Sequence, residues 1–139
     1  MTSRKPNWIA GQIMNSRVMA TTRRAKGQDL ALQLLSHGSS GVPVVELTGE
    51  VVGIVTEFDL LKAIHSGRDL HDIQAGDIMT ELPCCVDEHA SAEEVIQKMI
   101  EHRILRIPVL RDNKLVGMLS RTDILSHAID SHLLSVVSS

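Results

Sequence analysis

The chain contains two copies of one pattern, and this internal repeat constrains the fold more than any other feature of the sequence. Three segments recur in the same order: 11–14 (Gly-Gln-Ile-Met) as 76–79, 42–45 (Val-Pro-Val-Val) as 107–110, and 52–61 as 116–125. The offset is 65 residues for the first two pairs and 64 for the third, so the second copy has lost one residue. The loss falls at 47–50 against 111–114, where we expect a turn, because turns tolerate changes of length.

Both copies predict the same order of elements. Each begins with a short helical turn, at 9–14 and 76–79, followed by a brief extended piece, at 18–21 and 84–86. A helix, two strands joined by a tight turn and a final helix follow. The predicted strands are rich in β-branched residues and span 42–47 and 51–55 in the first copy and 106–110 and 115–119 in the second.

Helical spacing identifies the long helix of each copy. In the second copy Val95 and Met99 share one face, with His102 as a further candidate, and Ser91 with Glu94 forms a capping box. In the first copy Gly38 marks the end of the helix. The apolar spacing that predicts this helix is carried by Leu30, Ala31, Leu34 and Leu35.

The fold class predicted from this order is α+β, a tandem repeat of two β-α-β-β-α units. A unit of about 60 residues with a three-stranded sheet buries too little apolar area to be stable alone. We therefore expect the copies to pack sheet against sheet with pseudo-two-fold symmetry, leaving ligand clefts along the seam. The repeats are placed at 9–67 and 75–134, with tails at 1–8 and 135–139.

Composition excludes several classes of function. The net charge is −3 and the basic residues are dispersed apart from Arg23, Arg24 and Lys26, so neither nucleic acid nor a membrane surface is an expected partner. Trp8 and Phe58 are the only aromatic residues, which excludes base stacking on aromatic platforms. No signal peptide and no apolar run of about 18 to 20 residues is present. A disulfide between the adjacent Cys84 and Cys85 would be a strained ring and would not cross-link separate segments of the chain. The cysteine content therefore favours a reducing, cytoplasmic location.

The repeated motifs resemble those of the CBS domain pair, also called a Bateman module. The resemblance rests on Ile-Met, a hydrophobic-Pro-Val strand and Val-Gly-h-h-Thr/Ser-x-x-Asp-h-Leu (h, hydrophobic), each present twice, and it covers the chain from about Ile9 to Ala128. In that family the aspartate of this motif binds both ribose hydroxyls of an adenosine nucleotide and the Ser/Thr meets its phosphates. The resemblance thus implies two sites, at Thr56 and Asp59 and at Ser120 and Asp123.

The chemistry of the motif is consistent with this role. An aspartate three residues after the hydroxyl residue lies in the first turn of a helix, where its carboxylate accepts hydrogen bonds from two hydroxyls. Free backbone amides and the helix dipole favour a phosphate at the same end. The same spacing is also typical of a helix capping box, so a purely structural role for Asp59 and Asp123 stays open.

The resemblance also implies contacts outside the motif. Arg103 and Arg106 precede the second Pro strand and Arg121 follows Ser120, positions from which related proteins reach phosphates. The first-copy stretch 37–43 lacks both of the first two arginines, so we expect one strong site and one weaker site, or two sites for different ligands. The remaining implied ligand residues are His37, His102, and, around the base, Asn15, Thr80, Val42 and Ile107.

Catalysis and metal binding are not expected. No Ser/His/Asp or Cys/His arrangement is evident, and a hydrolase using the motif aspartates would lack a nucleophile and base. Cys84, Cys85 and His89 do not have the spacing of a zinc site, because such sites usually combine Cys-x-x-Cys with further ligands.

The implied function is that of a regulatory sensor. It would bind an adenosine-containing ligand, with AMP, ADP or ATP favoured and S-adenosylmethionine or NAD still open, and would signal to a separate protein. The alternative is a ligand-free interaction module whose aspartates only cap helices. Family members commonly pair through helices, so a homodimer is expected, with apolar positions at Leu60, Leu61, Ile64, Ile124, Leu125 and Ile129.

Overall fold

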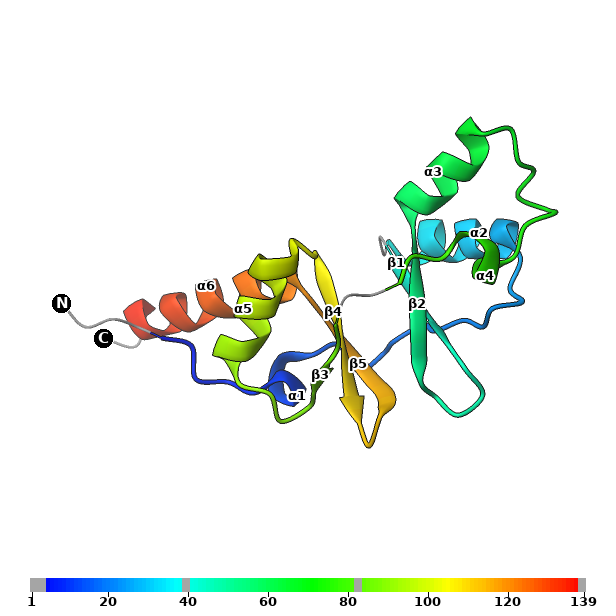
Figure 1. Cartoon of the computed structure of the whole chain (residues 1–139). Helices are drawn as coiled ribbons and strands as arrows, with labels where there is room; N and C mark the ends of the chain where they lie inside the picture. The colour runs from blue at the N-terminus through cyan, green and yellow to red at the C-terminus, as the bar shows by residue number, and fades with distance from the viewer. Residues whose placement is uncertain (1–4, 39–40, 82–83, 138–139) are drawn as a thin grey trace. The chain divides into compact units, whose positions relative to one another are not determined.

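A computed structural model describes residues 5–38, 41–81 and 84–137 of the chain (Figure 1). The predicted tails at 1–8 and 135–139 therefore lie partly outside the described residues. The chain divides into two compact units, which we name by their motif aspartates: the Asp59 unit, residues 19–82, and the Asp123 unit, residues 1–18 and 83–139. Within the described ranges no helix is long and apolar enough to cross a membrane.

The Asp59 unit consists of one antiparallel strand pair and three helices. Its elements are α2 (Gly27–His37), β1 (Gly41–Val45), β2 (Val51–Thr56), α3 (Glu57–His65) and α4 (Ala75–Ile78). Gly38 ends α2 in the left-handed conformation at φ 62°, as the sequence predicts. The helices and the inner face of the strands enclose a small core made by Leu30, Leu34, Val42, Val44, Val55, Leu60 and Ala75.

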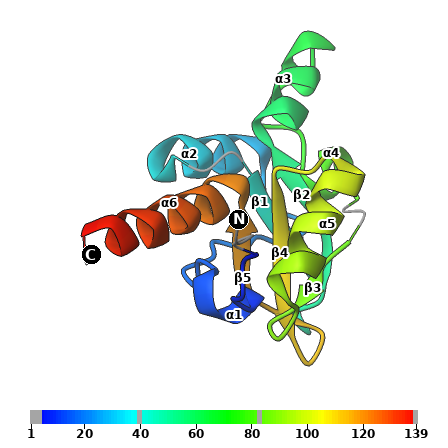
Figure 2. The same ribbon diagram turned by 90° about the vertical axis from the view of Figure 1, so that its left-hand side faces the viewer.

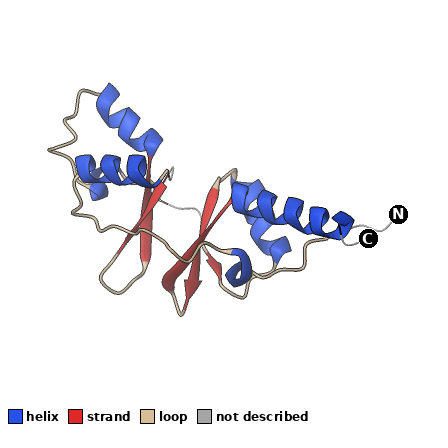
Figure 3. Cartoon of the chain, turned by 180° about the vertical axis from the view of Figure 1, so that it is seen from behind, coloured by secondary structure: helices blue, strands red, loops and turns tan. Residues whose placement is uncertain are grey.

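The Asp123 unit repeats the helix–strand–strand–helix order of the Asp59 unit and has a larger sheet. Its elements are α1 (Ala10–Ile13), β3 (Val86–Asp87), α5 (Ala92–His102), β4 (Arg106–Arg111), β5 (Lys114–Ser120) and α6 (Arg121–Val137). β3 runs parallel to β4, and β4 pairs antiparallel with β5. Asp112 and Asn113 form the tight turn between β4 and β5, both with positive φ. Taken by itself, each unit has its helices on one side of its strands (Figure 3), so the predicted tandem α+β repeat is confirmed.

Four local predictions are wrong. The extended piece at 18–21 is not a strand: only Thr21 pairs, with Val44, because the chain turns at 22–25 immediately afterwards. β1 ends at Val45 rather than at 47, and Leu47 lies fully exposed in the turn. Leu35 is 80% exposed, because α2 buries only the face that carries Leu30 and Leu34. His102, the further candidate for the apolar face of α5, is exposed as well.

The two opening helical turns are exchanged between the repeats. α1 starts the first sequence repeat but packs in the Asp123 unit, beside β5 and α6 (Figure 2). There the amide of Ala10 donates to the carbonyl of Ala90 at 2.9 Å. α4 starts the second repeat but packs in the Asp59 unit, where Ala75 N donates to Ala25 O at 2.7 Å. The sequence repeats at 9–67 and 75–134 and the structural units are thus two different divisions of the chain.

The residue after each opening turn forms a backbone bridge to the motif strand. Thr80 and Ile54 exchange two hydrogen bonds of 2.9 Å each, and Asn15 and Met118 exchange two of 2.8 and 3.0 Å. The crossing explains the glycine of the Val-Gly pattern. A Cβ on Gly53 would come within 3.0 Å of the Thr80 carbonyl oxygen, and one on Gly117 within 3.2 Å of that of Asn15.

Candidate functional site

The first motif lies where β2 ends and α3 begins. Thr56 caps the helix: its Oγ1 accepts a hydrogen bond from Asp59 N at 3.2 Å. In return Asp59 Oδ2 accepts from Thr56 N at 2.8 Å and from Thr56 Oγ1 at 3.0 Å. The first motif is therefore a reciprocal capping box, so the capping that the spacing allows is observed here.

The second carboxylate oxygen of Asp59 is also occupied. Oδ1 accepts a 2.8 Å hydrogen bond from Thr80 Oγ1, and the ammonium of Lys62 lies 3.7 Å from it. The whole residue is only 4% exposed. Both oxygens of the Asp59 carboxylate are thus used inside the protein, which meets the requirement that a buried charge be hydrogen-bonded and paired.

The second motif has the same cap but an open carboxylate. Asp123 Oδ2 accepts from Ser120 N at 3.0 Å and Asp123 N donates to Ser120 Oγ at 3.1 Å. Over the described ranges Oδ1 of Asp123 has no hydrogen-bond partner, and the residue is half-buried. Asn15 holds the position equivalent to Thr80, but its Oδ1 accepts from the amide of Arg17 at 3.0 Å. This motif therefore presents a free carboxylate oxygen at the start of α6.

Two arginines, Arg106 and Arg121, flank the second motif, and a third, Arg103, lies at the end of α5. Arg106 pairs directly with Ser120 across β4 and β5, and such cross-strand side chains lie on the same face of a sheet. Arg121 is the exposed first residue of α6, and Arg103 is the exposed C-cap of α5. In the first repeat the equivalents of Arg103, Arg106 and Arg121 are Gly38, Gly41 and Glu57. The second motif is thus strongly basic and the first is not.

The backbone of Arg103 adopts a conformation that favours glycine. Its φ is 53°, in the left-handed region, and the equivalent residue in the first repeat, Gly38, has φ 62°. An L-residue with a Cβ loses about 1 kcal/mol in this region relative to glycine. Arg103 therefore keeps a strained backbone conformation, of the kind that is often found at functional sites.

The other predicted ligand residues are divided between accessible and buried positions. His37 and His102 are the exposed last residues of α2 and α5. Val42 and Ile107 point their side chains into the two cores, so only their backbone atoms can contact a ligand. The contacts of Thr80 and Lys62 with Asp59 were not foreseen, because a separation of 21 residues for Thr80 gives no periodic signal.

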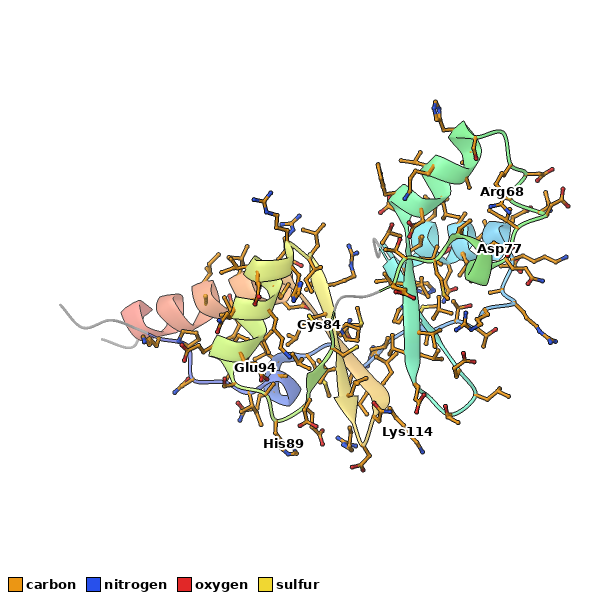
Figure 4. The ribbon with its side chains drawn as sticks, in the orientation of Figure 1. Arg68, Asp77, Cys84, His89, Glu94 and Lys114 are labelled. Carbon is orange, nitrogen blue, oxygen red and sulfur yellow. The ribbon has the colours of Figure 1, made fainter. Side chains whose placement is uncertain are left out.

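Cys84 and Cys85 are both partly buried, free thiols. Burial raises the pKa of both the Cys84 and the Cys85 thiols, and for Cys85 the neighbouring Cys84 raises it further, which disfavours the thiolate. Figure 4 places Cys84 and His89 at separate points along the chain on either side of β3. In the part of the chain that the structure describes, no three His, Cys, Asp or Glu residues are grouped to hold a metal ion.

A family model described as "CBS domain" matches the chain twice, at residues 10–66 and 75–130. Among curated proteins, the chain is 28% identical over 129 residues to the uncharacterized protein MK0525 of Methanopyrus kandleri, covering 91% of this chain and 65% of that protein. It is 35% identical over 97 residues to the uncharacterized protein YlbB of Bacillus subtilis, covering 69% and 66%. The chain thus spans slightly less than two thirds of the length of these relatives.

Solved structures share the fold. The CBS domain pair of protein MJ0100, in complex with 5′-methylthioadenosine and S-adenosyl-L-methionine, has a TM-score of 0.80 at 24% identity, covering 91% of this chain and 99% of that chain. CBSX2 in complex with AMP has a TM-score of 0.77 at 25% identity, covering 90% and 98%. Hypoxic Response Protein I, with two coordinated zinc ions, has a TM-score of 0.79 at 27% identity, covering 86% and 98%.

The different surroundings of the two aspartates predict different costs of removal. We expect Asp59→Ala to lower the free energy of unfolding by about 2 to 4 kcal/mol, because it removes a cap and leaves the Thr80 hydroxyl without its acceptor. Asp123→Ala should lower it by about 0.5 to 2 kcal/mol, the range of a cap alone. Urea denaturation at pH 7 measures both. Asp77→Ala, which removes an exposed carboxylate bonded to Gln74 N, is the control, and equal losses at Asp59 and Asp123 would contradict the prediction.

Proposed function

The chain belongs to the CBS domain family, as a pair of CBS repeats, and on this basis we propose that it is a regulatory module that binds an adenosine-containing ligand at the Asp123 motif. The proposed module has no catalytic activity of its own and signals to a separate protein. A cytoplasmic location forms part of the proposal, in keeping with two adjacent free cysteines. The observation that carries it is Oδ1 of Asp123, which has no partner among the described residues and belongs to a motif flanked by Arg106 and Arg121.

The geometry supports a ribose at Asp123. A vicinal diol needs a carboxylate that can accept from both hydroxyls, and Oδ1 of Asp123 is open to one of them while Oδ2 has capacity beyond its cap. The site combines both repeats within one unit, because Asn15 of the first repeat bridges to Met118 of the second. CBSX2, a structural neighbour at 25% identity, was solved with AMP, which supports an adenosine ligand for this chain.

The charge around the motif favours a phosphate-bearing ligand. Arg106 lies opposite Ser120 across β4 and β5, Arg121 is the first residue of α6, and Arg103 is the C-cap of α5. Guanidinium groups bind phosphates through charge-assisted hydrogen bonds. AMP, ADP and ATP are therefore proposed ahead of NAD, and all of these ahead of the positively charged S-adenosylmethionine. Signalling would then be a shift between states of the module, limited by the ligand's difference in affinity for them.

A second candidate function is a ligand-free interaction module. The observation in its favour is the first motif, in which every oxygen of Asp59 is already used by the protein. Under this alternative Asp123 would also serve only as a cap. Ligand-dependent stabilisation distinguishes the two functions.

Ligand binding is expected to raise the melting temperature of the wild-type chain. A ligand at a hundred times its Kd adds about 2.7 kcal/mol, or about 5 to 15 °C at this size. A thermal melt with AMP, ADP, ATP, NAD and S-adenosylmethionine measures the shift. Asp123→Ala should abolish it and Asp59→Ala should retain it, each relative to its own unliganded melt. No shift with any ligand at millimolar concentration would favour the interaction module.

Arg103 offers a test of the phosphate contact. Arg103→Gly should raise the free energy of unfolding by about 0.5 to 1 kcal/mol, because glycine relieves the left-handed backbone. The same substitution should weaken ATP binding about tenfold while leaving adenosine nearly unaffected. Isothermal titration with both ligands measures the difference. Arg103→Ala is the matched control, expected to lose affinity without gaining stability, and equal losses for ATP and adenosine would contradict a phosphate contact.

A homodimer is also proposed, through exposed apolar side chains on α3 and α6. Leu61 and Ile64 on α3 and Leu125 and Ile129 on α6 are exposed, whereas the other two positions expected from the sequence, Leu60 and Ile124, pack against the cores. Sedimentation at micromolar concentration should give about twice the 15.2 kDa chain mass, and Ile129→Glu should shift it to the monomer with unchanged melting. A wild-type monomer would refute the dimer.

A further inference from the structure

We propose that the hydroxyl of Thr80 is a built-in occupant of the Asp59 carboxylate, which prevents the first motif from binding a ribose and leaves Asp123 as the open adenosine site of the chain. The inference rests on the proposed function, since it divides the two motifs into one that binds and one that is blocked. It gives Thr80 a role different from the base contact that the resemblance implies.

The first step is the state of the Asp59 carboxylate. Oδ1 accepts from Thr80 Oγ1 at 2.8 Å, Oδ2 accepts twice from Thr56, and the side chain is 3% exposed. A ribose hydroxyl can reach Oδ1 only by displacing the threonine hydroxyl from a part-buried, charge-assisted hydrogen bond, in which Asp59 is buried and Thr80 is exposed. Lys62, 3.7 Å away, further satisfies the same oxygen. A ligand at this motif would therefore replace bonds that already exist rather than add new ones.

The second step is how firmly Thr80 is held. Its amide and carbonyl both bond to Ile54, each at 2.9 Å, so the backbone of the residue is fixed to the motif strand. Gly53 allows this close crossing, because any side chain there would collide with Met79 and with the Thr80 carbonyl oxygen. The fold has thus already ordered Thr80, and its hydroxyl reaches Asp59 with little further loss of conformational entropy.

The third step is the comparison with the equivalent residue of the other repeat. Asn15 makes the same backbone bridge, to Met118, at 2.8 and 3.0 Å. Its amide oxygen is instead the acceptor for the backbone amide of Arg17 at 3.0 Å, which turns the side chain back on its own segment. Asp123 consequently keeps Oδ1 free among the described residues. At equivalent positions, the closed Asp59 motif therefore has a threonine, Thr80, and the open Asp123 motif has an asparagine, Asn15.

The test exchanges the two residues in the full-length chain. AMP binding is measured by equilibrium dialysis for the wild type, Thr80→Asn, Thr80→Ala and Asn15→Thr, with Thr80→Ser as the control that keeps the hydroxyl. The wild type and Thr80→Ser should bind one AMP per chain. Thr80→Asn and Thr80→Ala should bind a second. Asn15→Thr should weaken the original site about 10- to 100-fold, the equivalent of one hydrogen bond to a charged group.

A background without the second site makes the result independent of the proposed function. On Asp123→Ala, Thr80→Asn or Thr80→Ala should create AMP binding that a further Asp59→Ala removes, with folding checked by circular dichroism. If the wild type binds one AMP through Asp123 but neither Thr80 variant binds in this background, the occupant role is overturned while the proposed function stands. Two AMP per wild-type chain, one of them lost in Asp59→Ala, would also overturn it. If the wild type binds no AMP, the proposed function fails for AMP, and the Thr80 variants still decide the occupant role by gaining a site or not.

Discussion

The backbone bonds between each unit and the opening turn of the other repeat are the constraint on which the structure depends. Ala10 with Ala90 and Ala75 with Ala25 are the corresponding pairs, and both alanines of the opening turns are fully buried. The same segments continue to Asn15 and Thr80, which lie against the strands that carry the motifs. The exchange therefore completes each core and also brings the backbone of one residue, Thr80 or Asn15, against each motif strand. The contacts of each opening turn thus contribute both to the core of its unit and to the surroundings of the motif in that unit.

On this shared scaffold the two repeats have diverged in charge and in polar satisfaction. The first has Gly38, Gly41 and Glu57 where the second has Arg103, Arg106 and Arg121. Asp59 is buried with all its bonds made inside the protein, while Asp123 is half-buried with one oxygen free in the described part of the chain. Burial and satisfaction favour a structural role, and exposure with surrounding positive charge favours recognition of an anion. The two repeats therefore share a backbone arrangement, but their motifs differ in charge and in the hydrogen bonds of the aspartate.

The sequence predicts the local elements well because their signals are local. The Thr56–Asp59 cap, the glycine that ends α2 and the turn at Asp112 and Asn113 each depend on residues within a few positions of one another. Failures come where partners are distant. The residue types at 18–21 do not indicate that only Thr21 pairs with a strand residue, Val44.

The same limit applies to the site. The motif residues and the surrounding arginines are evident from the repeat, but the separation of 21 residues between Thr80 and Asp59 hides their contact. The exchange of α1 and α4 is also hidden, because their backbone partners lie far along the chain, Ala90 for Ala10 and Ala25 for Ala75. The closed carboxylate differs from the open one by a contact with a residue that is distant in the sequence.

The exchanged turns also affect how the chain reaches its fold. Ala10 finds its partner 80 positions along the chain, and Asn15 bridges to a residue 103 positions away. Contacts at such sequence separation form late and slowly. The chain must first lose the conformational entropy of closing a long loop, and only then do the contacts stabilise the fold. During synthesis Ala10 stays unpaired until residue 90 has been made, and Asn15 until residue 118 has been made. A chain cut at 67–74 would give two fragments, one without α4 and the other without α1. Each fragment carries the turn that the other one lacks, so the two would complete their cores by associating.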